Sequence, residues 1–384
     1  MISRILAAGS LIVLSSAAEA QSIASRVNAV RDGKVRMTFA SRDDICGFNG
    51  GMSRGKDNHM NWSNDKGSED VDYDVECSEG PARIVVEKSG GSISKIKAYV
   101  GGRWRPARVT DLGVVGVREV TSWLLDVASN ESGKVAGNAI FATTLADSVD
   151  MTQPLYQFAR NESRPNEARD QAIFWLGQLP NESAVGLLER ILEESRESSI
   201  KEKAIFALSQ HQSGRGMPVL RDFAGRTNET EKLRGSAIFW LGQRRGESTQ
   251  FLRNLYSKVG SEELKDKVIF SLSQQKGVND EWLLDLVSNT REPVEMRKKA
   301  LFWAGQTGAP MSKLASIYSR TTDREMKDQM IFVFSQRREP AAFDKLMDIA
   351  KNDPDRQARR KAMFWLGQSR DPRVASMLSD IINK

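Results

Sequence analysis

Hydrophobic residues recur at a regular interval along the C-terminal two-thirds of the chain. A short apolar element, in most copies Ala-Ile-Phe, returns every 30 to 33 residues. The phenylalanines of its eight copies are Phe141, Phe174, Phe206, Phe239, Phe270, Phe302, Phe332 and Phe364. Such a period is typical of solenoids, whose units bury their apolar faces only by stacking on their neighbours. The pattern predicts an all-α superhelical solenoid of about eight repeats over residues 112–384.

Each repeat contains two segments with helical periodicity. The first is amphipathic, with apolar residues such as Leu187, Leu188 and Ile191 on one face, and the second carries the Ala-Ile-Phe element. Helix breakers such as Asp353-Pro354 lie between the two segments. We therefore expect helical hairpins, and we expect a last helix over residues 374–382 to cap the final core.

The second helix resembles that of HEAT repeats, in particular the HEAT-like repeats of exported bacterial proteins. It carries a basic residue, then small or apolar residues, then Leu-Gly, as in residues 169–177 and 359–367. The resemblance covers about 70% of the chain and implies a HEAT-like fold in which the second helices line the concave surface. It implies no particular function, because such solenoids serve many.

A basic residue stands five positions before the phenylalanine in seven repeats. These residues are Arg169, Lys201, Arg234, Lys265, Arg297, Lys327 and Arg359. The series resembles a binding ladder, but the matching residue of HEAT repeats commonly pairs with acids near the preceding turn. Acids stand close by here at Glu167, Glu231, Glu263, Glu295 and Glu325. We therefore interpret the series as structural.

A glutamine follows the phenylalanine by four positions in seven repeats, so the two side chains share one face of the helix, away from the hairpin core. In one interpretation the rings pack against the next repeat and the amides hydrogen-bond along the stack. In the other, both are exposed to an extended peptide. We favour packing for most repeats, and half-exposed rings would satisfy both interpretations. The candidate partner-binding residues are Phe206, Gln210, Phe239, Gln243, Phe270, Gln274, Phe302 and Gln306.

Two further positions alternate from repeat to repeat. In the tryptophan repeats, the phenylalanine is followed by Trp and, two positions later, by Gly; these are the repeats of Phe174, Phe239, Phe302 and Phe364. In the serine repeats, a smaller residue and Ser stand at the same positions; these are the repeats of Phe206, Phe270 and Phe332. The alternation predicts a packing unit of two repeats.

The N-terminal part has a different pattern. Residues 1–20 combine a positive start, a short apolar stretch and Ala18-Glu19-Ala20, as in a signal peptide. We expect export to the periplasm or the exterior, with no integral membrane segment after cleavage. Residues 34–39, 83–88 and 93–100 have strand patterns, and the last two are expected to form a hairpin across Ser89-Gly90-Gly91-Ser92. Residues 21–111 are therefore predicted to form a small, mainly β domain, whose last residues, 104–111, link it to the solenoid.

Composition and chemistry narrow the function further. The chain has two cysteines, Cys46 and Cys77, which we expect to form a disulfide in an exported domain. The net charge of +6 is mild, and no nucleic-acid partner is expected. The acids Asp70, Asp72 and Asp74 are interpreted as a strand edge rather than a cation site. We predict no catalytic residues, no cofactor and no metal site.

The leading hypothesis is therefore an exported, non-catalytic scaffold that binds a protein or peptide on the concave face of the solenoid. One alternative is a HEAT-like lyase or another enzyme that uses the solenoid as a substrate cradle. A second is binding of envelope polyanions through Arg244-Arg245, Arg337-Arg338 and residues 359–361. Neither the identity of the partner nor the oligomeric state follows from the sequence.

Overall fold

The computed structural model divides the chain into two compact units, which meet in sequence between Trp175 and Leu176. The described residues are 21–43, 45–48, 51–54, 69–72, 80–244, 246–275, 277, 279–369 and 373. The predicted signal peptide, Cys77 and the predicted cap helix lie outside these residues. Cys46 lies in a strand, and the disulfide stays a prediction.

The first unit contains a six-stranded sheet in the order β3-β2-β6-β5-β1-β8. Its strands are β1 (Gly33–Phe39), β2 (Ile45–Phe48), β3 (Gly51–Arg54), β5 (Ala82–Ser89), β6 (Ser92–Val100) and β8 (Thr110–Val114). Neighbouring strands are antiparallel except β1 and β8, which are parallel. A separate antiparallel pair joins β4 (Val71–Asp72) to β7 (Arg103–Trp104). The predicted β structure of the N-terminal part is confirmed as a mixed sheet, and the expected link contributes to β7 and β8.

Local sequence explains the central strands. Along β1, Val35, Met37 and Phe39 are fully buried, and the residues between them are half-buried. This alternation is that of a strand with one face on a core. β5 and β6 meet at Gly90 and Gly91, whose φ angles are +59° and +86°. Two consecutive positive φ angles belong to a type I′ turn, which glycine adopts without strain. The predicted hairpin is confirmed.

A buried ionic cluster ties β1 and β6 to the segment before β4. Asp70 accepts hydrogen bonds from Lys34 Nζ (2.8 Å), Lys97 Nζ (3.0 Å) and the Tyr99 hydroxyl (3.3 Å). Burial alone would raise the pKa of Asp70, but the two ammonium groups outweigh burial and hold that pKa below its usual value. Asp70 is therefore a structural carboxylate.

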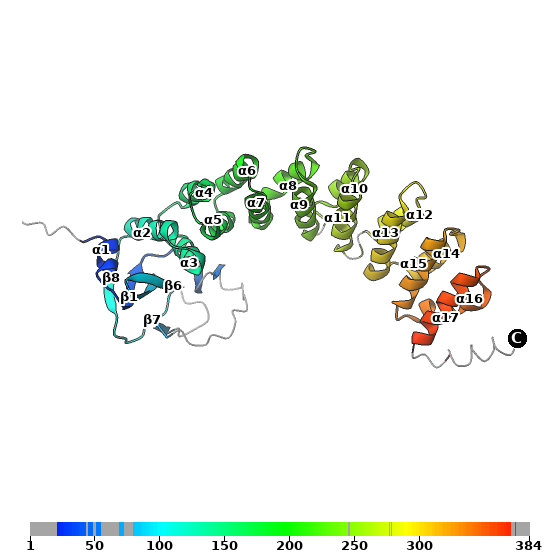
Figure 1. The fold of residues 1–384 in the computed structure, drawn as a ribbon, viewed down its shortest axis with the longest axis horizontal. Helices are drawn as coiled ribbons and strands as arrows, with labels where there is room; N and C mark the ends of the chain where they lie inside the picture. Colours follow the sequence, from blue (N-terminus) through cyan, green and yellow to red (C-terminus); the bar gives the residue numbers. More distant parts are fainter. Residues whose placement is uncertain are drawn as a thin grey trace, which may run out of the picture. The chain divides into compact units, whose positions relative to one another are not determined.

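Helices complete the first unit. They are α1 (Ile23–Asn28), α2 (Val117–Asn130), α3 (Gly133–Thr143), α4 (Thr152–Arg160) and the greater part of α5 (Asn166–Gln178). α2 and α3 form a hairpin, and α3 packs on β6 (Figure 1). There the Asn138 amide donates to the carbonyl of Ile96 at 2.8 Å. The sheet and the first hairpin thus share one core.

The second unit consists of helical hairpins. Its helices are α6 (Ser183–Glu194), α7 (Ser198–Gln210), α8 (Gly216–Gly225), α9 (Glu231–Gln243), α10 (Thr249–Lys258), α11 (Glu262–Ser273), α12 (Asp280–Ser288), α13 (Val294–Thr307), α14 (Met311–Arg320), α15 (Arg324–Ser335), α16 (Pro340–Asn352) and α17 (Arg356–Gln368). Even-numbered helices form one layer and odd-numbered helices the other (Figure 1). Each odd-numbered helix from α7 on packs against the next odd-numbered helix. This confirms the predicted solenoid of repeated hairpins.

The odd-numbered helices carry the Ala-Ile-Phe element, and α9 illustrates how sequence places it. Thr230 caps the helix by accepting the N–H of Leu233, a common way to begin a helix. Ala237, Ile238 and Leu241 are fully buried, as the helical positions around Phe239 predict. In the described part of the chain, no helix is long and apolar enough to cross a membrane.

Candidate functional site

Aromatic side chains of the odd-numbered helices form a ribbon along the second unit. The aromatic ribbon comprises Phe206, Phe239, Trp240, Phe270, Phe302, Trp303, Phe332, Phe364 and Trp365. Each tryptophan contacts two phenylalanines, one in its own repeat and one in the serine repeat before it. Trp240, for example, lies 5.0 Å from the ring of Phe239 and 5.0 Å from that of Phe206. These centroid separations are typical of favourable aromatic pairs.

Where no tryptophan bridges two repeats, the phenylalanine rings of neighbouring repeats can stack directly on each other. The rings of Phe239 and Phe270 lie 6.2 Å apart with an interplanar angle of 9°. Ring contacts therefore run without a break from Phe206 to Phe302, and again from Phe332 to Phe364.

The ribbon is packed and exposed at the same time. Five of its phenylalanines are half-buried: Phe206, Phe239, Phe270, Phe302 and Phe332. Phe364, at the end of the described solenoid, is 58% exposed. A monomeric protein rarely exposes a contiguous apolar strip unless that strip binds something. The two interpretations of the phenylalanine series are therefore compatible.

The glutamines border the ribbon and point to solvent. Gln210, Gln243, Gln274 and Gln306 are all exposed. In all three serine repeats the amide donates to the serine immediately before it, Gln210 to Ser209 at 3.0 Å, Gln274 to Ser273 at 3.2 Å and Gln336 to Ser335 at 3.1 Å. Among the described residues, no hydrogen bond joins the glutamine of one repeat to that of the next. The expected amide ladder along the stack is therefore wrong, and the amides are available to a ligand.

The alternation of repeats produces two kinds of junction. We call the contact from a serine repeat to the next tryptophan repeat an ionic junction, and the contact from a tryptophan repeat to the next serine repeat a glycine junction. At glycine junctions the helices approach closely. A methyl group at Gly242 would lie 2.6 Å from Cβ of Ser271, and one at Gly177 would lie 2.8 Å from Cβ of Ala207. Only glycine fits such an approach, which explains why glycine alternates with the small residues.

At ionic junctions a lysine of the basic series reaches into the next repeat. Lys201 pairs with Glu229 at 2.7 Å, and Lys265 pairs with Glu292 at 2.9 Å. The carboxylates stand in the turn between the two helices of the following tryptophan repeat. The structural interpretation of these lysines is supported, but the predicted partner acids are wrong. Glu295 and Glu325, for instance, bind Lys298 instead.

The arginines of the basic series have a different partner. Arg169 donates to the carbonyl of Ala159 at 2.9 Å, Arg234 to that of Ala224 at 3.0 Å and Arg297 to that of Val287 at 2.9 Å. These carbonyls belong to the last turns of α4, α8 and α12 and would otherwise lack an intrahelical donor. Each arginine thus closes its own hairpin, whereas each lysine connects two hairpins.

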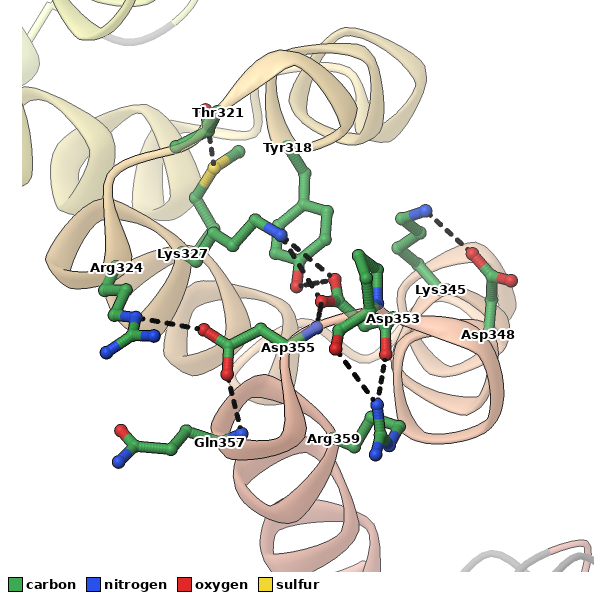
Figure 2. A network of polar contacts seen from close by, with 12 residues as sticks. Tyr318, Thr321, Arg324, Lys327, Lys345, Asp348, Asp353, Asp355, Gln357 and Arg359 are labelled. Atoms are coloured by element: carbon green, nitrogen blue, oxygen red, sulfur yellow. Dashed lines mark hydrogen bonds and ion pairs between the residues drawn. The ribbon is translucent and has the colours of Figure 1, made fainter.

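The third ionic junction shows the lysine contact in its most elaborate form (Figure 2). Lys327 Nζ lies 3.3 Å from each carboxylate oxygen of Asp353, and the Tyr318 hydroxyl donates to the same carboxylate at 2.7 Å. The lysine ammonium also lies 5.2 Å from the centre of the Tyr318 ring, as in a cation–π contact. Tyr256, Lys265 and Glu292 repeat this arrangement two repeats earlier.

These contacts shift the pKa values of the groups involved. Burial alone would raise the pKa of Asp353, but the hydrogen bond from Tyr318 and the Lys327 ammonium outweigh burial and lower it. Burial and the neighbouring Asp353 carboxylate raise the pKa of Tyr318. Asp353 is therefore ionised and Tyr318 neutral at physiological pH, which suits a structural link rather than acid–base chemistry.

Sequence reasoning missed the partner acids and the tyrosines of this link. The sequence did contain a hint that the basic residues have two roles. The basic series is Arg in every tryptophan repeat and Lys in every serine repeat, so it alternates together with the Trp/Gly and Ser positions. The partners stand 26 to 28 residues after their lysines. That separation becomes meaningful only once adjacent repeats are stacked.

Most of the basic residues proposed for polyanion binding are already occupied. Arg244 donates to the carbonyls of Ser209 and His211, and Arg337 to those of Gly305 and Ala309. Residue 359 donates to a backbone carbonyl, and residue 361 pairs with a carboxylate. Exposed basic side chains remain at 338 and 360, while residue 245 lies outside the described residues.

Titratable groups are otherwise dispersed. In the described part of the chain, no three His, Cys, Asp or Glu side chains are grouped as metal ligands. His211 is fully buried, and its ring nitrogens bond to Ser213 and to the carbonyl of Asn181. Burial lowers the pKa of His211 despite that carbonyl. These contacts give His211 a structural role between repeats.

Comparisons with known proteins complete the description. No family model matches the chain, and no curated protein matches it. Solved structures similar to the chain include Escherichia coli YibA, at 12% identity over 66% of this chain and 96% of that chain, with a TM-score of 0.37. Human deoxyhypusine hydroxylase in complex with glycerol is 18% identical over 60% of this chain and 88% of that chain, with a TM-score of 0.29.

A third similar structure is the complex of CpcE and CpcF of phycocyanin lyase from Nostoc, at 13% identity over 66% of this chain and 94% of that chain, with a TM-score of 0.27. Similarities this distant carry no statement about function. The assignment of the chain as a solenoid of helical hairpins rests on its own repeats.

Proposed function

We propose that this chain is an exported, non-catalytic scaffold that binds a protein or peptide partner along the aromatic ribbon. The observation that carries the proposal is the arrangement of half-exposed rings beside a row of exposed amides on one layer of the solenoid. Rings offer apolar area at a low cost in conformational entropy, and amides both donate to and accept from a peptide backbone.

The repeat spacing suits an extended ligand. Packed helices lie about 8–10 Å apart, so successive ribbon positions recur at about that distance. An extended strand advances about 3.3 Å per residue, so one repeat corresponds to about three ligand residues. A partner segment would therefore meet a ring and an amide at regular intervals along its length.

The proposal of export rests on the N-terminal pattern of residues 1–20. The enzyme alternative would need grouped titratable side chains in a pocket, and the polyanion alternative would need free basic side chains. The hydrogen bond of His211 to a backbone carbonyl does not favour the enzyme alternative, and the hydrogen bonds of Arg244 and Arg337 to backbone carbonyls do not favour the polyanion alternative.

Paired variants on the two helix layers test the proposed surface. Phe239→Leu with Gln243→Ala alters the ribbon, while Trp282→Leu with Gln250→Ala alters an aromatic and an amide on the even-numbered layer. Immobilised chains are used to capture proteins from envelope extracts, and thermal unfolding is measured in parallel. We expect only the first variant to lose a partner that the native chain retains. Equal capture by both variants, or loss that merely follows unfolding, would contradict the proposal.

A further inference from the structure

The ribbon is bordered, on the side away from the glutamines, by a second series of side chains. The residue four positions before one phenylalanine faces the residue three positions before the next. At two ionic junctions these are an acid and a lysine that form an ion pair: Asp266 with Lys299 at 2.9 Å, and Asp328 with Lys361. Their charges cancel, so these junctions offer no net charge to a ligand.

At the glycine junction between Phe239 and Phe270 the corresponding pair is incomplete. Its two facing residues are Gly235 and Lys267, so the acid is missing. A Cβ atom at Gly235 would lie 3.3 Å from Cγ of Lys267, and therefore the lysine stem rests on the glycine backbone. Lys267 is exposed, and none of the described carboxylates lies within ion-pair distance of it.

Lys267 lies close to both rings of the stacked pair, Phe239 and Phe270. It stands three residues before Phe270, and Gly235 stands four residues before Phe239, so each lies one helical turn from a ring. The rings stack at 6.2 Å, and the exposed amides of Gln243 and Gln274 follow one turn further on. The Lys267 ammonium, two parallel rings and two exposed amides thus follow one another across α9 and α11.

We propose that the Phe239–Phe270 junction binds a peptide segment in which an acidic residue lies next to an apolar or aromatic residue. The carboxylate pairs with Lys267, and the apolar side chain packs on the exposed edges of the stacked rings. Charge complementarity favours an acidic ligand, since Lys267 supplies a positive charge that no carboxylate among the described residues pairs with. The inference rests on the proposed function and adds to it the chemistry of the partner.

Two labelled peptides test this chemistry directly. One alternates Asp and Phe over eight residues, and the other carries Asn in place of each Asp. Fluorescence anisotropy with the full chain at low salt measures both affinities. We expect the Asp peptide to bind at least about threefold more tightly than the Asn peptide, in keeping with one solvent-exposed ion pair, and added salt to reduce the difference.

Variants assign the preference to one side chain. Lys267→Ala is expected to abolish the preference for the Asp peptide, and Lys267→Glu to shift it toward a peptide that alternates Lys and Phe. Lys299→Ala is the matched control, because Lys299 occupies the same repeat position but is paired with Asp266. It should leave the preference unchanged.

Several outcomes would overturn the inference: equal binding of the Asp and Asn peptides, no measurable binding of either, or a preference that survives Lys267→Ala. The proposed function is distinguishable from it. If Gln243→Ala weakens partner capture while Lys267→Ala does not, the ribbon remains a binding surface and only the acidic chemistry fails.

Discussion

Two kinds of junction alternate along the solenoid, and they hold neighbouring repeats together by different physical means. At ionic junctions such as that of Lys327 and Asp353, an ion pair and an aromatic contact cross from repeat to repeat. At glycine junctions such as that of Gly242 and Ser271, the backbones approach so closely that shape alone decides what fits.

The contrast explains why a two-repeat period is superimposed on the period of a single hairpin. A lysine needs an acid in the turn of the next repeat, a tryptophan needs a phenylalanine in the repeat before it, and a glycine needs a side chain smaller than tryptophan in the repeat after it. These needs are met only when repeats of the two types alternate. Both junction types nevertheless leave the phenylalanine half-exposed. Ring contacts cross the ionic junctions and the Phe239–Phe270 glycine junction, and they are interrupted between Phe302 and Phe332.

The largest expected effect comes from breaking an ionic junction. Asp353→Ala removes the carboxylate that binds Tyr318 and Lys327, so the buried Tyr318 hydroxyl and the half-buried Lys327 ammonium both lose their charged partner. We expect a loss of about 3 kcal/mol in the free energy of unfolding, measured by urea denaturation. Lys232→Ala is the control, because Lys232 also forms an ion pair between repeats, with Glu202, but its side chain is exposed to solvent. It should change stability by less than about 0.5 kcal/mol, and an equal effect of the two variants would contradict the account.

Breaking a glycine junction should have the next largest effect. In Gly242→Ala the new methyl group meets Cβ, Cα and the carbonyl oxygen of Ser271, none of which can move without shifting a helix. We expect a loss of about 2 kcal/mol in stability. Gly367→Ala, at the same position of the last repeat, meets no atom within 4 Å. It should be neutral or should stabilise by up to about 1 kcal/mol, since alanine favours the helix.

Acid should weaken ionic junctions selectively. The folded-state pKa of Asp353 lies below its unfolded value, so this carboxylate contributes stability that is fully present above about pH 4 and is lost as the pH falls through the folded-state pKa. The difference in unfolding free energy between the native chain and Asp353→Asn should therefore shrink by about 1 kcal/mol between pH 7 and pH 3. Chemical denaturation at both pH values measures it. A constant difference would show that the link does not depend on ionisation.

The smallest effect distinguishes rigid from adaptable glycine junctions. A methyl group at Gly305 would meet chiefly the side chain of Val333, whereas one at Gly242 meets backbone atoms of Ser271, which only a shift of the helix could move. Gly305→Ala should therefore cost less than about 1 kcal/mol, clearly less than Gly242→Ala. Comparing the two melting temperatures checks this order. A reversed order would mean that backbone contact does not set the strength of these junctions.

Periodicity was enough to predict the solenoid, the core face and the phenylalanine–glutamine face, because each depends only on residues within one helix. The partners of the lysines depend on how hairpins stack: for Lys265 the sequence pointed to the nearby Glu263, whereas the structure uses Glu292 of the next repeat. The role of Lys267 likewise depends on a missing side chain at Gly235, in the neighbouring helix. Contacts within an element were predictable, whereas contacts between elements were not.

The first unit follows the same rule. The alternation of β1 and the glycines of the β5–β6 turn predicted local structure correctly. The pairing of β8 beside β1 was missed, because a short strand such as Thr110–Val114 has no strong pattern of its own. The two lysines that pair with Asp70 were also missed, because they come from strands distant in the sequence.

Side-chain footprinting tests the central claim, that the aromatic ribbon is a binding surface, most directly. Hydroxyl-radical oxidation is compared for the native chain alone and bound to its captured partner, with Phe239, Phe270 and Phe302 as the reporting rings. The account predicts that the partner protects these rings and leaves Trp282, on the even-numbered layer, as reactive as before. Unchanged oxidation of the ribbon, with protection confined to the even-numbered helices, would contradict it.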